Sequence, residues 1–226
     1  MTFSITARCP ETGQFGIAIT SSSIAVASRC SFARAGVGAV ATQNITDPRL
    51  GPLGLDLMEG GVGAEAALAN LLDGYRDAEF RQLALVDKQG DVAHFSGAHT
   101  LGTHAVAIGP GAVAAGNLLA GTGVPAAMLA RFEATTGDSF AERLLAALDA
   151  GLVAGGEEGP IHSAGLLVVE AEAWPLIDLR VDWAAPDAPL EELRKLWQAW
   201  QPLMRDYVQR ALDPGQAPAF GVPGDR

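Results

Sequence analysis

Alternating polar and apolar residues open the chain and predict a β-strand over Thr2–Arg8. The polar residues share one face and the apolar residues share the other: Thr2, Ser4, Thr6 and Arg8 against Phe3, Ile5 and Ala7. A period of two is typical of a half-buried strand. Turn residues at 10–13 and a second alternating run at 15–20 complete a hairpin. The sequence therefore predicts an opening hairpin that begins at Thr2.

Further strand-like runs follow along the chain. Strands are expected over 24–32, 36–43, 83–86, 92–95, 105–108, 113–118, 163–170 and 176–183. Turn sequences at 89–91 and 109–111 separate runs of the middle group at hairpin-like spacing. Strands joined by hairpins favour antiparallel sheets.

Between the strand groups, the spacing of apolar residues changes to that of helices. Leucines over 50–74 are spaced for two helices, which glycines at 60–61 separate. A second helical pair is expected later in the chain. Pro125 suits the first turn of one helix, and the other is expected to begin at an Asp138 N-cap and to stop at Gly151.

A final helix is expected over 190–212, with a kink at Pro202. Its apolar residues form one stripe, which we interpret as core packing: Leu193, Trp197, Trp200, Met204 and Tyr207. Helices that arrive in pairs between groups of strands indicate a helical layer on each of two sheets. The expected fold is of the α/β (α+β) class, a four-layer α-β-β-α sandwich of two antiparallel sheets. A Rossmann sheet would need single helices between single strands.

Length and charge restrict the functional classes. A chain of 226 residues favours one domain, expected over 1–212 with a C-terminal tail at 213–226. The net charge of −11 is explained by solubility, and it argues against nucleic-acid and membrane partners. The first residues lack the flanks and the apolar core of a signal peptide, so a cytoplasmic protein is expected. Cys9 and Cys30 make no disulfide framework.

Common catalytic motifs do not occur in this sequence. It has no Gly-x-Ser-x-Gly run and no phosphate loop, so no nucleotide cofactor is expected. His94, His99 and His104 follow one another at intervals of five residues. This spacing does not align them on a helix, and ordinary hydrogen-bonded histidines are the alternative to metal binding. We expect neither a metal nor another cofactor.

Thr2 is the candidate nucleophile. A threonine hydroxyl needs a base, and the α-amino group of the same residue serves once Met1 is removed. The ordinary pKa of an α-amino group is about 7.7–8.0, so much of it is unprotonated near neutral pH. Threonine is also a common strand residue, and that simpler explanation stays open.

Several runs of the sequence carry a resemblance to a known family. They are Thr2-Phe3-Ser4-Ile5, Pro-Glu-Thr-Gly at 10–13, and the stretches 33–43, 51–55, 81–84 and 116–121. Through these runs the chain resembles, over nearly its whole length, the domain of unknown function 1028 family. The fold of that family is similar to that of the N-terminal-nucleophile (Ntn) hydrolases, which cleave amide bonds. The resemblance implies an Ntn-hydrolase-like fold and places Thr2 at the position of the nucleophile.

Polar residues at the ends of expected strands are candidates for the rest of the site. Asn117 is the candidate oxyanion donor, because a side-chain amide stabilises a developing oxyanion without changing charge. A turn-forming asparagine is the alternative. Ser21 and Ser22 end the second strand, and Gln43 and Asn44 close another beside the same expected cleft. Each of these four either holds a polar substrate or caps a strand.

Positive charge at the site is expected from Arg34, although arginine does not transfer a proton near neutral pH. The lysine that helps the threonine of proteasome-like enzymes has no counterpart, because Lys88 and Lys195 lie elsewhere in the sequence. Many relatives have a Gly-Gly-Asp-x-Arg-Gly-x-Gln-Ser-Ala run before the late strand. Here residues 155–164 read Gly-Gly-Glu-Glu-Gly-Pro-Ile-His-Ser-Ala, and His162 is the candidate substrate contact. If that loop touches the substrate, the difference implies that this chain belongs to a subgroup with a different substrate.

Two functions follow from these residues. The first is hydrolysis of a small amide-type (C–N) bond, in which Thr2 attacks after loss of Met1 and Asn117 holds the oxyanion. The second is a non-catalytic protein of the same fold that binds a small polar metabolite. A homo-oligomer is expected in both cases, because the Gly- and Ala-rich strands and the Trp197/Trp200 stripe leave apolar surface.

Overall fold

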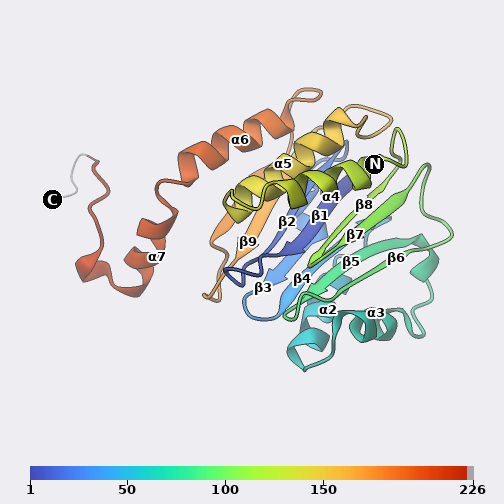
Figure 1. Cartoon of the computed structure of the whole chain (residues 1–226), viewed down its shortest axis with the longest axis horizontal. Helices are drawn as coiled ribbons and strands as arrows, with labels where there is room; N and C mark the ends of the chain where they lie inside the picture. Colours follow the sequence, from blue (N-terminus) through green and yellow to red (C-terminus); the bar gives the residue numbers. More distant parts are fainter. Residues whose placement is uncertain (223–226) are drawn as a thin grey trace.

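Two antiparallel sheets pack face to face in the computed structural model of the chain, which describes residues 1–222 (Figure 1). The six-stranded sheet has the order β10-β9-β2-β1-β8-β7, and the four-stranded sheet has the order β3-β4-β5-β6. The first contains β1 (Thr2–Arg8), β2 (Phe15–Ser21), β7 (Ala105–Gly109), β8 (Ala112–Asn117), β9 (Ser163–Val169) and β10 (Ile177–Val181). The second contains β3 (Ser31–Arg34), β4 (Gly38–Asn44), β5 (Arg81–Asp87) and β6 (Val92–Ser96).

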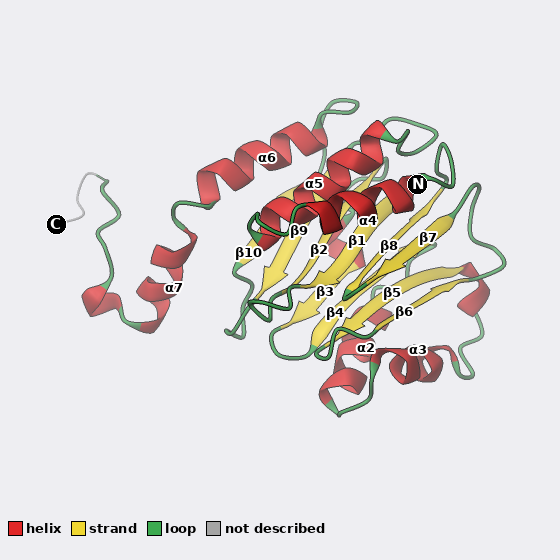
Figure 2. Cartoon of the chain, in the orientation of Figure 1, coloured by secondary structure: helices red, strands yellow, loops and turns green. Residues whose placement is uncertain are grey.

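Helices cover the outer face of each sheet, so that the layers run α-β-β-α (Figure 2). The six-stranded sheet carries α4 (Val124–Ala134) and α5 (Phe140–Val153), and the four-stranded sheet carries α2 (Leu50–Glu59) and α3 (Ala64–Leu72). The remaining helices are α1 (Ala27–Cys30), α6 (Pro189–Trp200) and α7 (Met204–Leu212), with short 3-10 turns η1 (Ala78–Phe80) and η2 (Pro214–Gln216). The expected fold class and both helical pairs are confirmed.

Three apolar clusters hold the layers together. One lies between α4, α5 and the six-stranded sheet and includes Phe3, Ile5, Met128, Leu144 and Leu148. A second lies under α2 and α3 and includes Leu50, Leu55, Leu68, Leu83 and Leu85. The third fills the space between the sheets and includes Phe15, Ile17, Ile19, Ala41 and Val113. Burial of both faces of both sheets is the main stabilising contribution of this architecture.

The first strand is buried on both faces. Its apolar face packs toward the helices, as the alternation predicts, but its polar face lies between the sheets, where Thr2 is 6% exposed and Ser4 is fully buried. The Ser4 hydroxyl donates a hydrogen bond of 2.9 Å to Gln43 Oε1 on β4 of the other sheet. The prediction of two faces is therefore confirmed, and the prediction of half-burial is wrong because a second sheet covers the polar face.

The strand expected over 24–32 is only partly present. The chain turns at Ala25, whose φ of 53° is left-handed, and then forms α1 before β3 begins at Ser31. The Arg29 guanidinium donates to the carbonyl oxygen of Ala25 at 2.9 Å and stabilises this turn. Apolar content alone does not distinguish a short helix from a strand.

Helix α5 begins and ends elsewhere than predicted. Ser139, and not Asp138, is the N-cap, because its hydroxyl accepts from the Glu142 N–H at 3.4 Å. The helix continues past Gly151 to Val153. Gly151 serves close packing instead of termination, since a Cβ there would lie 2.8 Å from Met128 Cγ.

The C-terminal region forms two helices in place of one kinked helix. Residues 201–203 separate α6 from α7, so the break is sharper than the expected kink at Pro202. Trp197 is buried and its indole N–H donates to Glu142 Oε1, whereas Tyr207 on α7 is 41% exposed. Figure 1 shows α7 extending away from the sheets. Within residues 1–222, no helix has the length and apolar content needed to cross a membrane.

Candidate functional site

Three hydroxyl and amide side chains meet where strands of the six-stranded sheet begin or end. Thr2 begins β1 and is paired with Asn117, the last residue of β8. On the other side of β1, the Ser21 hydroxyl at the end of β2 lies 3.2 Å from Thr2 Oγ1. Directly opposed residues of neighbouring strands share one face, so these side chains gather between the two sheets.

Met1 covers this group of side chains. Its carbonyl oxygen accepts a hydrogen bond of 2.5 Å from Thr2 Oγ1 and another from Ser21 Oγ. The Met1 side chain lies against the loop after α5, where a Cβ on Gly159 would be 3.1 Å from Met1 Cε. Removal of Met1 would therefore free both hydroxyls and open a space of about one residue above Thr2.

A network of buried amides lies beneath the hydroxyls and joins the two sheets. Gln43 Oε1 accepts from Ser4, and Gln43 Nε2 donates to Gln82 Oε1 at 2.7 Å. Gln82 Oε1 also accepts from Asn117 Nδ2 at 3.1 Å, while Gln82 Nε2 donates to Ser96 Oγ and to a backbone carbonyl at the end of β8. Gln82 is thus the centre of the network, and it fixes the side chain of Asn117.

Asn117 retains hydrogen-bonding capacity after its bond to Gln82. A side-chain amide nitrogen carries two N–H donors, and one of them is used by Gln82. Asn117 Oδ1 is buried and has no partner among the described residues. The side chain can therefore offer both a donor and an acceptor to a group that takes the place of Met1.

Glu157 belongs to this site, and the sequence analysis did not identify it. The residue is 6% exposed and forms an isolated β-bridge with Leu119, just beyond β8. Its Oε2 accepts from the Ser22 N–H at 3.1 Å. Burial raises the pKa of the Glu157 carboxyl to about 7, while the positive chain terminus and the Ser22 N–H act in the opposite direction. An acid at the third position of the 155–164 run, where many relatives have aspartate, was the available signal.

The predicted contacts at the ends of β2 and β4 have different surroundings. Ser22 contributes its backbone N–H to Glu157, and Gln43 is 1% exposed within the amide network. Asn44 has a left-handed φ of 73°. Its side chain joins two loops, since Nδ2 donates to Phe80 O at 2.7 Å and Oδ1 accepts from Leu101 N at 3.1 Å. Ser21 is the one of these four whose side chain contacts Thr2.

Arg34 is not brought to Thr2. It is paired with Gly38, at the opposite end of β4 from Gln43, and its guanidinium binds Asp56 at 2.9 Å and Glu59 at 2.5 Å on α2. It therefore supplies no positive charge to the hydroxyls of Thr2 and Ser21.

His162 lies near the site only through its backbone. Its N–H donates to the Ser21 carbonyl oxygen at 2.8 Å. The imidazole stacks on Trp183, with ring centroids 4.3 Å apart, and its Nδ1 lies 2.9 Å from Ala184 O. A role of His162 in binding substrate would need this stack to open.

We expect chelation to leave the protein unchanged. No group of three or more His, Cys, Asp or Glu side chains within residues 1–222 is arranged to hold a metal ion. His99 packs against Phe80 with centroids 4.8 Å apart, and His104 Nδ1 lies 3.2 Å from the carbonyl oxygen of Gly102. Dialysis against EDTA should leave the midpoint of thermal unfolding unchanged. A stoichiometric metal in elemental analysis that is lost in His94→Ala or His99→Ala would contradict this expectation.

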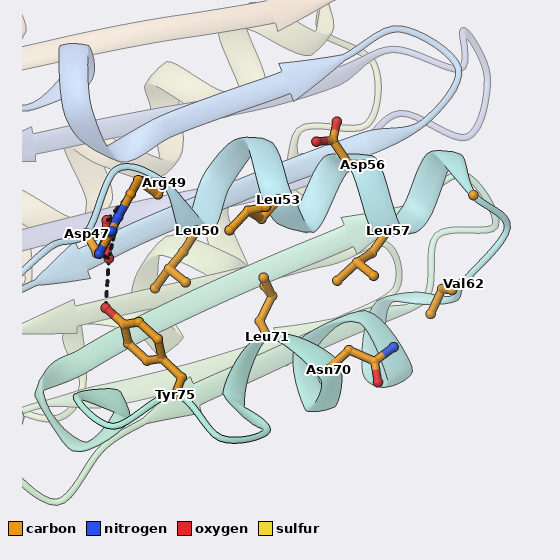
Figure 3. Close-up of a pocket in the computed structure, with 11 residues that line it drawn as sticks. Asp47, Arg49, Leu50, Leu53, Asp56, Leu57, Val62, Asn70, Leu71 and Tyr75 are labelled. Atoms are coloured by element: carbon orange, nitrogen blue, oxygen red, sulfur yellow. Dashed lines mark hydrogen bonds and ion pairs between the residues drawn. The ribbon is translucent and has the colours of Figure 1, made fainter.

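A separate groove of about 650 Å³ lies between α2 and α3, on the outer side of the four-stranded sheet (Figure 3). Its wall is mainly apolar: Leu50, Leu53, Leu57, Val62 and Leu71. At one end, the Asp47 carboxylate binds Arg49 at 2.6 Å and accepts from the Tyr75 hydroxyl at 2.7 Å. These contacts hold the pKa of Asp47 well below its usual range, and the hydrogen bonds from Arg49 have the largest effect. Thr2 does not line this groove.

Comparisons with known proteins agree on one family. The model described as a family of unknown function, DUF1028, matches residues 2–193. The chain is similar to the crystal structure of protein SPO2555 from Silicibacter pomeroyi, of the same family, with 30% identity, a TM-score of 0.83, and coverage of 91% of this chain and 94% of that one. Anbu (ancestral beta-subunit) from Yersinia bercovieri is 12% identical with a TM-score of 0.38, over 92% of this chain and 97% of that one. The curated proteins contain no match.

Proposed function

The chain belongs to the DUF1028 family of unknown function, and we propose from the site of Thr2 that it is an Ntn-hydrolase-like enzyme that cleaves a small amide-type (C–N) bond. The observation that carries the proposal is the position of the Thr2 hydroxyl. It lies at the start of a central strand, 3.2 Å from Ser21 Oγ and opposite Asn117, under a single removable residue. Cytoplasmic aminopeptidases remove an initiator methionine when the second residue is small, and threonine meets that condition.

The reaction begins when the α-amino group of Thr2 takes the proton from Thr2 Oγ1. The oxygen then attacks the carbonyl carbon of the substrate, and the negative charge that develops on the carbonyl oxygen is held by Asn117 Nδ2–H and backbone N–H groups. The amine product leaves with the transferred proton, and water releases the acid from the ester on Thr2. Ser21 Oγ, which contacts both Thr2 Oγ1 and the Met1 carbonyl, lies where it can bind the substrate.

The space above Thr2 limits the substrate to small molecules. Before processing, that space holds Met1 between the strand ends and Gly159. A screen of protein that begins at Thr2 against small amides, ureides and acyl amino acids tests the proposal. Turnover that disappears when Met1 is retained is the supporting result, and a substrate cleaved equally well with Met1 in place would contradict it.

Asn117→Ala is expected to lower kcat by about a hundredfold or more, the usual effect of losing one oxyanion donor. The substrate KM should change less, because the donor acts mainly on charge that develops during the reaction. Asn70→Ala, on α3 and remote from Thr2, is the matched control. An unchanged kcat in a folded Asn117→Ala protein would exclude the side chain from oxyanion binding.

The alternative is a protein of the same fold that binds a small polar metabolite without cleaving it. The cover over Thr2 favours this alternative if Met1 stays, because Thr2 is then 6% exposed and its hydroxyl is bonded to Met1. The intact mass of protein purified from its natural host separates the two functions. Loss of Met1 is required for the enzyme, and its retention supports the binding protein.

We also expect a homo-oligomer, although the contribution first assigned to Trp197 is wrong, because this side chain is buried against α5. Exposed apolar side chains are instead found on and next to α7, including Leu203, Tyr207 and Leu212. Apolar surface of this kind is typical of interfaces between subunits. Light scattering at micromolar concentration should give a multiple of the 23.3 kDa chain mass. A monomer at that concentration would contradict the expectation.

A further inference from the structure

One amide oxygen and one carboxyl oxygen, both buried on the segments that flank Thr2, have no hydrogen-bond partner among the described residues. They are Asn117 Oδ1 and Glu157 Oε1. Buried polar atoms are nearly always paired, because an unpaired one loses its hydration without compensation. Two unpaired acceptors on neighbouring segments therefore indicate a donor that is absent while Met1 is in place.

The loop that carries Glu157 is fixed against the ends of the strands that flank β1. The Leu119–Glu157 bridge and a hydrogen bond of 3.0 Å from Glu158 N to Leu118 O attach it beside the end of β8. Glu157 Oε2 accepts from Ser22 N at 3.1 Å and so attaches it to the end of β2. The carboxyl group is held between the two strands whose side chains contact or face Thr2.

The charge on Glu157 has no side-chain counter-ion. None of the ion pairs in the described part of the chain includes this residue. Burial raises its pKa, and the first opposing influence is the positive charge of the chain terminus. The terminal amino group therefore already lowers the pKa of this carboxyl when that amino group is on Met1, one residue before Thr2.

We propose that Glu157, with Asn117 Oδ1, binds the α-amino group of Thr2 after Met1 is removed and positions it as the base for the Thr2 hydroxyl. This inference rests on the proposed function and adds a positioning residue to it. When the amine takes the proton of Thr2 Oγ1 it becomes an ammonium with three N–H donors. The two unpaired oxygens accept from that group, and the carboxylate balances its positive charge. The amine thus becomes a stronger base than it would be in water, while a smaller fraction of it is unprotonated near neutral pH.

The test measures the pKa of the Thr2 amino group and needs no substrate. Protein that begins at Thr2 is made by cleavage of a ubiquitin fusion, and the rate of acetylation of its terminus is followed against pH by peptide mass spectrometry. The amine pKa of the wild type should lie above the ordinary range of about 7.7–8.0. Glu157→Gln, which keeps the shape and removes the charge, should lower that pKa by about one unit or more.

Glu158→Gln is the matched control, because it makes the same change in charge at the adjacent, exposed residue. It should leave the amine pKa of Thr2 unchanged. Glu157→Asp keeps the charge and should retain more of the elevation than Glu157→Gln. The other titratable groups near the amine do not change between wild type and Glu157→Gln, since His162 and Glu158 are present in both. The Cys30 thiol, whose pKa burial raises to about 11, stays neutral over most of the pH range in which the amine titrates.

Equal amine pKa values in Glu157→Gln and Glu158→Gln would overturn the proposal. If Glu157→Gln does not fold, a wild-type amine pKa at or below the ordinary range would overturn it as well. The outcome is separate from that of the hydrolase proposal. An elevated, Glu157-dependent amine pKa in a protein that cleaves nothing would leave the positioning role intact. An active enzyme whose amine has an ordinary pKa would exclude only the positioning role of Glu157.

Discussion

Replacing Gln82 with leucine is expected to lower the free energy of unfolding by about 3 kcal/mol. Gln82 is fully buried between the sheets, and its side chain accepts from Gln43 and Asn117 and donates to Ser96. Leucine has a similar volume but offers no polar atoms, so the amides of Gln43 and Asn117 each lose a partner. Each buried donor left unpaired costs about 1–3 kcal/mol. Urea unfolding of the two proteins measures the difference.

Gln89→Leu is the matched control for this experiment. Gln89 lies in the turn between β5 and β6, is exposed, and uses only its backbone N–H, which donates to Asp87 Oδ1 at 2.9 Å. Its substitution should change the free energy of unfolding by no more than about 0.5 kcal/mol. A similar small change in Gln82→Leu would mean that the amide network contributes little to the stability of the sandwich.

The elements that the sequence predicts well are those whose signal is local. The alternation at the start of the chain, the helical spacing over 50–74 and the hairpin turns each reflect how a short segment buries one face. These signals were enough to predict two antiparallel sheets between helical layers. The segment at 24–32 failed because Ala25 adopts a left-handed backbone conformation, which depends on its bonds to neighbours and not on its apolar character.

The candidate site was harder to predict because it depends on register between distant strands. Ser21 and Asn117 lie beside Thr2, since all three are at strand ends that an antiparallel sheet brings together. Arg34 was assigned to the same region, but the register of β3 with β4 places it at the other end. Glu157 was missed because its place in a loop does not distinguish it from the exposed Glu158, and the aspartate that many relatives have at its position was the one available signal. Only the bridge to Leu119 buries it.

Replacing Thr2 with alanine is expected to lower turnover by at least about a thousandfold, as loss of a nucleophile does in other hydrolases. The fold should persist, because the methyl group of alanine fits where the hydroxyl lies and the hydroxyl bonds only to Ser21 and to the residue that is removed. Thr2→Ser keeps the hydroxyl and the amine and should retain part of the activity. Thr2→Cys should keep a nucleophile that alkylation inactivates.

Thr6→Ala is the matched control for the nucleophile, because the same substitution is made on the same face of β1. Thr6 is fully buried and its Oγ1 has no partner in the described part of the chain, so its loss should leave kcat unchanged. Protein with a retained N-terminal extension should behave like Thr2→Ala, since the α-amino group is then part of a peptide bond and is no longer a base. Equal turnover by wild type and Thr2→Ala would exclude an N-terminal nucleophile. Activity that depends on the hydroxyl but survives the extension would keep Thr2 as nucleophile and exclude its amine as the base.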